Sequence, residues 1–448
     1  MIKIKIPNNN LNEREYIINI LFNEFLGLKY KVEISDKIEN WELELSNGKT
    51  LIILDSFFNL NKTSLSYLRL ENIPSSVEFT ENEFIIENDI PILFGNKNVK
   101  KYDNSIICGI DIFAASFFML IRWEEHVNKK RDKLNRFSAS DSIAFKNNFL
   151  ERPIVNEYTE MLWNILIHLG YKGKRKKKDF KLIPTHDVDF LLLSQTPLKI
   201  IIKTLGGDIL KRKNFKLAVS FLKDYVISLF SQKNDPYNTF EYIMDTSEKK
   251  DLKSYFFFMG EGKTIYDNNY STEDNYLKEI ISKIKKRNHH VGIHPTFNAY
   301  NDFEQFKKEK NELEENLDSS ISFGREHYLR FEVPTTWQIW EDNNMEWDSS
   351  LGYHDKEGFR CGVCYEFSVF NVLTRKKLKL KEKPLIFMEG SFIQYQSHLT
   401  PLEIELKIKM LKEIVQKYNG EFVFLWHNSS FNNRIWGKYQ YIYEKVLK

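Results

Sequence analysis

Cysteine is scarce in this chain, with three residues among 448. Three cysteines cannot build the disulfide framework of many secreted domains, and the start MIKIKIPNNN lacks the apolar segment of a secretion signal. We therefore expect a cytoplasmic protein. Cys361 and Cys364 form a CxxC pair, but the third cysteine is Cys108, so a four-cysteine zinc site is excluded and a redox pair is the less favoured alternative.

Long apolar runs, glycine and proline are also scarce. The longest apolar run, Ile112 to Ile121, is half of the roughly 20 residues that a membrane-spanning helix needs, so we interpret it as a buried helix. With 18 Gly, 11 Pro and 42% hydrophobic residues, the chain is neither disordered nor collagen-like. It is expected to be globular, with a sizeable core.

An excess of one charge is missing as well. Lys and Arg number 65 against 62 Asp and Glu, a net charge of +3, which argues against a protein whose whole surface binds nucleic acid. The basic run between Lys172 and Lys178 is expected to be a solvated linker, with contact to phosphate or to an anionic membrane as its alternative. We expect no nucleic-acid partner.

The pattern of the chain changes near residue 178. Short alternating strands and helices before it predict a small N-terminal α/β domain over residues 1–178, ending in the basic linker. Over residues 179–448, apolar strand-like runs alternate with helices such as 275–287, 303–317 and 401–418. This alternation predicts the α/β class with a parallel sheet, either a barrel or an open doubly wound sheet.

Residues 198–231 interrupt that alternation with a long, lysine-rich amphipathic stretch. We expect a basic helical insertion packed on the sheet. Peripheral contact with a membrane surface is the alternative, because a basic amphipathic helix can lie in the interface of a bilayer.

Polar side chains directly follow the apolar runs. The carboxyl ends of parallel strands share one rim, so residues far apart in sequence are expected to meet there. These residues are Asp187, Asp189, His294, Arg330, Glu389 and His427.

Four of these positions suggest hydrolytic chemistry. Asp187 and Asp189 are two apart, so in an extended strand both carboxylates point to one side, where one can hold a metal and the other can accept a proton. His294 can bind a divalent ion together with a carboxylate, and His427 is placed for general acid work at neutral pH. Turn capping by the aspartates and a structural role for His427 are the alternatives.

Five segments in order make the chain similar to a known family. THDVD, GIHP, HYLRFEVP, WDSSLGY and LWHN resemble the motifs of the NodB-homology polysaccharide deacetylases, the fourth carbohydrate esterase family. Four further segments, FFMLIRWEEH, DPYNTFEYI, GFRCGVCYEF and LWHNS, resemble more closely an uncharacterised bacterial branch found in surface-polysaccharide gene sets, in which an extra N-terminal α/β domain precedes the barrel. The resemblance implies a distorted, TIM-like (β/α) barrel over residues 179–448.

The resemblance also implies a metal site. Asp187 matches the general base, Asp189 stands in for the metal-binding Asp, and His294 matches the first His of the metal motif. The position of the second His is Asn298, a poor ligand for zinc. Either a third ligand comes from elsewhere, or the metal is weak or absent; the nearest candidates are His186 and His327.

The remaining roles follow in the same way. Arg330 resembles the Arg that braces the catalytic Asp, with Arg325 competing for that role, and His427 resembles the late His that acts as general acid. Trp347 and Asp348 resemble the motif that walls the substrate groove. Two further residues are candidates for the groove by their position and type, Arg360 and Trp426.

The implied activity is metal-dependent removal of an N-acetyl group from a sugar or polysaccharide precursor, as in the biosynthesis of a bacterial surface glycan. The implied cofactor is a divalent ion, with Zn²⁺ as first choice, and the implied partner is an N-acetylated saccharide. Asn298 motivates the alternative, an inactive deacetylase-like barrel that binds glycan or scaffolds a biosynthetic complex.

Overall fold

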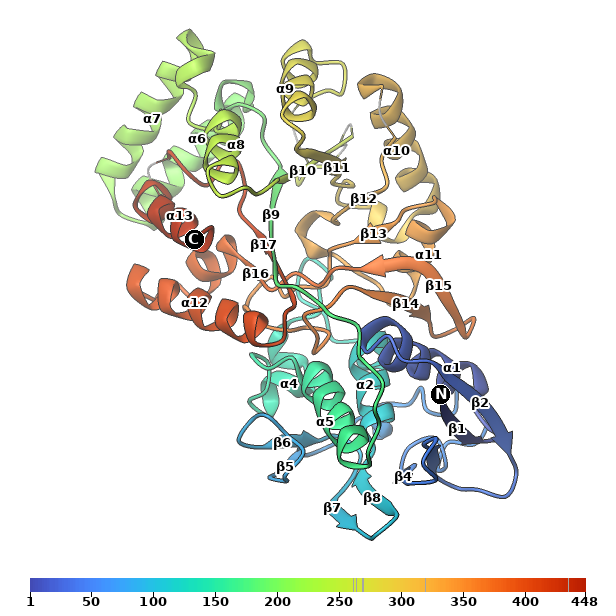
Figure 1. The fold of residues 1–448 in the computed structure, drawn as a ribbon. Coiled ribbons are helices and arrows are strands. Elements are labelled where there is room, and N and C mark those ends of the chain that lie inside the picture. The colour runs from blue at the N-terminus through green and yellow to red at the C-terminus, as the bar shows by residue number, and fades with distance from the viewer. Residues whose placement is uncertain (261, 263, 268–269, 319, 434) are drawn as a thin grey trace.

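The protein is described by a computed structural model that covers residues 1–448 apart from 261, 263, 268–269, 319 and 434. It has mixed α/β architecture with two main sheets, one from each half of the chain (Figure 1). No helix within the described residues is long and apolar enough to cross a membrane.

The first half builds a six-stranded sheet in the order β2-β1-β3-β4-β8-β7. Its strands are β1 (Ile2–Pro7), β2 (Tyr30–Ser35), β3 (Trp41–Glu44), β4 (Thr50–Ile53), β7 (Gly95–Lys101) and β8 (Ser105–Ile110), and β5 (Glu78–Thr80) pairs separately with β6 (Ile90–Ile92). The helices are α1 (Leu11–Ile18), which continues into a π-helical turn, α2 (Ile112–Ile121), α3 (Trp123–Val127), α4 (Ile143–Lys146) and α5 (Ile154–His168).

Helix α2 explains the longest apolar run of the sequence. All ten of its residues are buried, and the side chain of Asp111 caps it by accepting a hydrogen bond from the backbone N–H of Ala114 at 3.0 Å. A helix that is apolar on all sides must be covered on all sides. The expectation of a buried helix is confirmed.

The second half builds a nine-stranded sheet in the order β14-β15-β13-β12-β11-β10-β9-β17-β16. Eight of these strands run parallel, and β14 is antiparallel to β15. The strands are β9 (Lys181–Val188), β10 (Tyr255–Phe258), β11 (His290–Ile293), β12 (Phe323–Gly324), β13 (Trp347–Asp348), β14 (Phe367–Asn371), β15 (Lys376–Glu382), β16 (Phe387–Met388) and β17 (Glu421–Leu425).

Helices connect these strands and cover the sheet (Figure 1). They are α6 (Leu198–Gly206), α7 (Phe215–Phe230), α8 (Phe240–Glu248), α9 (Asn275–Lys286), α10 (Phe303–Leu317), α11 (Thr335–Asp342), α12 (Pro401–Lys417) and α13 (Gln440–Val446). The three helices predicted from periodicity form α9, α10 and α12. Helix α12 begins where the sequence signals it, with Pro401 in the first turn and a capping box between Thr400 and Glu403.

The large sheet is strongly curved. Tyr255 of β10 and Trp347 of β13 are three strands apart in the sheet order, which in a flat sheet would separate them by roughly 14 Å. Their rings instead lie 5.5 Å apart on the concave side. The α/β class and the parallel sheet agree with the prediction from the sequence. The hydrogen-bonded strand order runs from β14 at one edge to β16 at the other, and closure of the sheet into a complete barrel stays a prediction.

One predicted strand is wrong. The segment 327–334, which contains Arg330, forms no strand: a 3-10 turn occupies His327–Leu329, and the strand is the two-residue β12 just before it. Gly324 permits this strand, because a Cβ atom there would lie 1.9 Å from the carbonyl oxygen of Ile293 in the neighbouring strand. The residue that directly follows the strand is therefore Arg325, not Arg330.

The two halves share a buried interface. Glu125 of α3 forms an ion pair with Arg360, with both side chains almost fully buried, and the Tyr16 hydroxyl donates a hydrogen bond to the carbonyl oxygen of Ser368 at 2.9 Å.

The division of the chain into two domains near residue 178 stays a prediction. The three cysteines are buried and free, and burial raises the pKa of the Cys364 thiol, as expected of inert thiols.

Candidate active site

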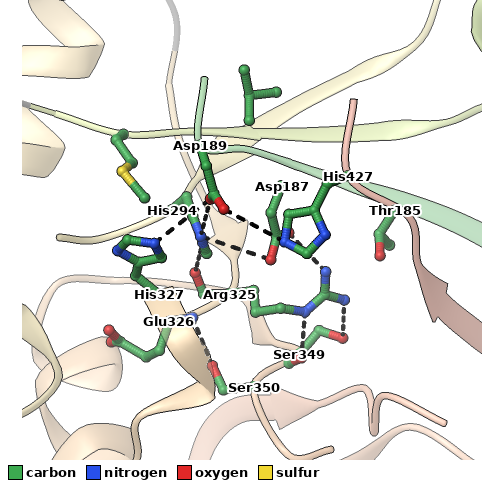
Figure 2. A network of polar contacts seen from close by, with 12 residues as sticks. Thr185, Asp187, Asp189, His294, Arg325, Glu326, His327, Ser349, Ser350 and His427 are labelled. Carbon is green, nitrogen blue, oxygen red and sulfur yellow. Dashed lines mark hydrogen bonds and ion pairs between the residues drawn. The ribbon is translucent and has the colours of Figure 1, made fainter. Parts of the chain in front are cut away.

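A cavity of about 290 Å³ opens at the carboxyl ends of the parallel strands of the large sheet. Asp187 and Asp189 come from the end of β9, His294 follows β11, and His427 lies two residues after β17 (Figure 2). The expectation that these four residues meet agrees with their placement in the structure. The cavity is also lined by Arg136, Phe190, His327, Tyr328, Leu329, Met388, Glu389, Gly390, Gln394, Tyr395, Leu425, Ser429, Ser430 and Trp436.

Asp189, His294 and His327 form a group that could hold a metal ion. One ligand atom from each lies within 4.8 Å of the other two. Oδ1 of Asp189 is 3.3 Å from Nε2 of His294 and 3.7 Å from Nε2 of His327. One carboxylate and two imidazoles make up a common ligand set for zinc.

The hydrogen bonds of this group fit a metal site. Nδ1 of His294 donates to the backbone carbonyl of Arg325 at 2.7 Å, which leaves the lone pair on Nε2 facing Asp189. Nε2 of His294 and Oδ1 of Asp189 are buried and have no hydrogen-bond partner among the described residues. Buried polar atoms normally form hydrogen bonds, so two such atoms that form none and lie 3.3 Å apart fit a divalent ion bound by both.

Asn298 is corrected as the third ligand. It is exposed, and its Oδ1 accepts a hydrogen bond from Nη1 of Arg330 at 3.4 Å. His186, the other alternative, alternates with Asp187 along β9 and points to the opposite face, where its Nδ1 lies 2.6 Å from the carbonyl oxygen of Trp426. Of the two alternatives named from the sequence, His327 is the one beside Asp189.

Arg325 braces Asp187. Its Nη1 lies 2.9 Å from Oδ1 of Asp187, while its Nε and Nη2 donate to the carbonyl and hydroxyl oxygens of Ser349 at 2.8 and 3.0 Å (Figure 2). With three of its donors occupied, the guanidinium is fixed in orientation and holds the carboxylate in one position.

Arg330, predicted for this role, is displaced from it. Its Nε donates to the carbonyl oxygen of Leu134 at 3.0 Å, and its guanidinium lies over the rings of Phe297 and Tyr300 at 3.8 and 4.1 Å. Arg330 follows the 3-10 turn and not a strand, so it is carried past the rim and packs against the first half of the chain.

His427 is held by Glu389. Nδ1 of His427 lies 2.6 Å from Oε1 of Glu389, and its Nε2 lies 3.6 Å from Oδ2 of Asp189. Burial alone would lower the pKa of His427, but the carboxylates of Glu389 and Asp189 outweigh it and raise the pKa to about 10. The imidazole is therefore a proton donor at neutral pH. Glu389 follows β16 in the sequence, but no role was predicted for it.

The four predicted groove residues lie outside the described lining of the cavity. Trp347 stacks on Phe323 with ring centroids 4.7 Å apart, near the beginnings of the strands. Asp348 is fully buried and accepts a hydrogen bond from the hydroxyl of Ser350 at 2.5 Å. Arg360 is held by its ion pair in the interface between the halves, and the indole of Trp426 donates to the carbonyl oxygen of Ser430 at 2.8 Å.

Residues from loops and from short helical turns form the walls that sequence reasoning missed. Tyr328, Tyr395 and Trp436 bring aromatic rings to the cavity, and Arg136 reaches it from the first half of the chain. Arg136 is fixed by Asp132 at 2.7 Å and donates to the Tyr395 hydroxyl at 2.9 Å. None of these residues directly follows a strand, so no strand-end signal marks them.

Comparison with known proteins gives one family model and a small number of solved structures. A family model described as "Family of unknown function (DUF7033)" matches residues 2–171. No curated protein matches the sequence.

Two solved structures resemble the fold at low identity. One, from Mycobacterium smegmatis, is described as a "putative polysaccharide deacetylase": it is 12% identical, with a TM-score of 0.38, over 61% of this chain and 84% of that chain. The other is a mutant of a CE4 family pseudoenzyme with restored enzymatic activity: it is 10% identical, with a TM-score of 0.28, over 60% of this chain and 62% of that chain.

Proposed function

We propose that this protein is a metal-dependent carbohydrate deacetylase that hydrolyses the N-acetyl group of a sugar or polysaccharide precursor. The observation that carries the proposal is the meeting of three kinds of group in one cavity. Asp189, His294 and His327 bring one ligand atom each to within 4.8 Å of one another, Asp187 is a carboxylate held by Arg325, and His427 is an imidazole with a raised pKa. Hydrolysis of an amide needs an activated water, a base and an acid.

Asp189, His294 and His327 would hold the metal, and zinc suits their mixed nitrogen and oxygen ligands. When bound, a divalent ion supplies Lewis-acid chemistry, which makes a water more acidic and a carbonyl more electrophilic. Asp187 accepts the proton of the attacking water on Oδ2, the oxygen atom that Arg325 leaves free. His427 donates its Nε2 proton to the departing sugar amine, with Glu389 fixing the ring and favouring its charged form.

The walls of the cavity suit a saccharide. A volume of about 290 Å³ is at the lower end of the roughly 300–1,000 Å³ of small-molecule sites, which favours one sugar residue with its acetamido group. Tyr328, Tyr395 and Trp436 offer rings on which the apolar face of a sugar can pack. A precursor of a bacterial surface glycan, modified in the cytoplasm where three free thiols stay reduced, is the proposed substrate.

The test is release of acetate from N-acetylated saccharides by the purified protein. We expect release that a chelator abolishes and that Asp187→Asn lowers at least about 100-fold, the size of a general-base contribution. Asp179→Asn, an exposed change just before β9, is the matched control and should leave the rate unchanged. Release that survives both the chelator and Asp187→Asn would overturn the proposal.

The inactive glycan-binding barrel remains the alternative, but its motive was a missing third ligand at Asn298. Because His327 offers a ligand atom beside Asp189, that motive is lost. A protein that binds N-acetylated saccharides, carries a full equivalent of metal and releases no acetate would favour the alternative.

A further inference from the structure

Exposed apolar side chains gather on one segment, residues 198–230. Of 28 large hydrophobic side chains that are exposed among the described residues, 11 lie in these 33 positions. Scattered exposed hydrophobic residues need no explanation, but a contiguous group marks an interaction surface. The eleven are Leu198, Ile202, Ile209, Leu210, Phe215, Val219, Leu222, Val226, Ile227, Leu229 and Phe230.

On helix α7 the exposed residues form one stripe. Phe215, Val219, Leu222, Val226 and Phe230 follow one another at intervals of three or four positions, so they share a face of the helix. Phe230 is 87% exposed. The face that packs on the protein is a different one, with Ala218 and Phe221 buried. Helix α7 lies at the edge of the molecule, at the upper left of Figure 1.

Basic side chains flank the stripe. Residues 198–230 contain seven Lys or Arg and two Asp, a net charge of +5 on a chain whose total is +3. Lys216 and Lys223 each come one position after a stripe residue, about 100° around the helix, so they border the apolar face. Lysines beside an apolar face are the arrangement of helices that lie in the interface of an anionic bilayer, where their long stems reach the headgroups.

A second cavity joins this segment to the active site. It has a volume of about 920 Å³, is lined by Lys203, Lys211 and Arg212 together with apolar residues of α6 and α7, and shares Phe190, Ser429 and Trp436 with the catalytic cavity. Surface binding at this segment would therefore bring the catalytic cavity close to whatever α6 and α7 lie on.

We propose that α6 and α7 dock the protein on an anionic lipid bilayer, with the stripe of α7 immersed and the flanking lysines on the lipid headgroups. The excess of positive charge selects this partner over a neutral surface, since each basic residue near an anionic membrane adds to the attraction. If the proposed deacetylase function holds, the saccharide would be modified at a membrane surface, which suits a saccharide that is attached to a lipid.

The test is co-sedimentation of the full chain with vesicles, without saccharide, so its result does not depend on the deacetylase proposal. We expect binding to equimolar phosphatidylglycerol and phosphatidylcholine vesicles, and at least tenfold weaker binding to phosphatidylcholine alone or at about 0.5 M salt. The triple variant Phe215→Ser, Leu222→Ser and Phe230→Ser, and separately Lys211→Glu, Lys216→Glu and Lys223→Glu, should each weaken binding at least tenfold.

Two matched controls should bind as the unaltered protein does. Leu402→Ser with Leu406→Ser removes equally exposed apolar residues from α12, and Lys172→Glu with Lys174→Glu reverses charges of the basic linker. Absence of binding to the anionic vesicles, or an equal loss in a control, would overturn the proposal. So would light scattering that shows a dimer which the α7 serine variant converts to monomers, because the stripe would then belong to a second copy.

Discussion

Oε1 of Glu389 accepts a hydrogen bond from Nδ1 of His427 at 2.6 Å, and the Glu389 side chain is buried. Because Oε1 is bonded to His427, Glu389 affects the reaction through the imidazole and not through direct contact with the substrate. Its charge favours the imidazolium, and its position fixes which nitrogen is turned toward Asp189. It is a positioning residue, and its effect is separable from that of His427.

Glu389→Gln should lower kcat by about 10- to 100-fold, since the side chain keeps its shape but loses the charge that favours the proton on His427. We expect KM and bound metal to stay unchanged, because no proposed ligand is altered. His427→Gln should lower kcat further, and the double variant no more than His427→Gln alone. Additive losses in the double variant would show that Glu389 does not act through His427.

His327→Ala should weaken metal binding at least about tenfold, because it removes one of three ligand atoms around Asp189. Asn298→Ala is the control and should retain the metal, since Asn298 is exposed and bonded to Arg330. Metal content after dialysis, measured by mass spectrometry, distinguishes them. Equal metal content in both variants would contradict the site described here.

Arg325→Lys should lower kcat about 100-fold, because a single ammonium cannot replace three directed N–H donors on Asp187 and Ser349. Arg330→Lys should cost stability, through its lost contacts with Leu134 and Phe297, and leave kcat within about threefold. Steady-state rates and thermal midpoints of both variants are the measurements. A larger loss of kcat for Arg330→Lys would restore the role first predicted for it.

The Glu125–Arg360 pair should make stability depend on pH in the acid range. Burial works to raise the pKa of Glu125, but Arg360 and Arg122 outweigh it and lower the pKa to about 2. Because the pKa of Glu125 is lower in the folded protein than its unfolded value of 4.5, the ionised carboxylate stabilises the fold by about 3 kcal/mol at pH values well above 4.5. This stabilisation is lost as the pH falls toward 2.

Glu125→Gln should therefore lower the free energy of unfolding by roughly 3–5 kcal/mol at pH 7 and by about 2 kcal/mol less than that at pH 3, measured by urea denaturation. Glu279→Gln, which removes an exposed pair with Lys283, should change it by less than about 1 kcal/mol at either pH. A Glu125→Gln variant as sensitive to acid as the unaltered protein would refute this assignment.

Sequence reasoning located Asp187, Asp189, His294 and His427 because each follows an apolar run long enough to predict a strand. It misplaced the bracing Arg because β12 has two residues and no periodicity, and what makes the strand possible is the close approach of Gly324 to Ile293. Such an approach is a property of two strands, which one segment of sequence cannot display.

His327 illustrates a second limit. It was an alternative ligand from the sequence, but its place beside Asp189 depends on a tight turn with Tyr328 and Leu329 at positive φ. The four predicted groove residues lie elsewhere for another reason. Large aromatic and charged side chains pack between layers of the fold as well as around cavities, and their partners elsewhere in the chain decide which of the two occurs. Trp347 and Arg360 are both such residues.

The pairing of β9 with β17 has a consequence for synthesis of the chain. Lys181 lies opposite Glu421, so the strand that carries both aspartates has an open edge until some 240 further residues have been made. During synthesis, the proposed acid His427, which follows β17, is the last of the proposed catalytic and metal-binding residues to be added. The proposed catalytic set is therefore incomplete until His427 has been made.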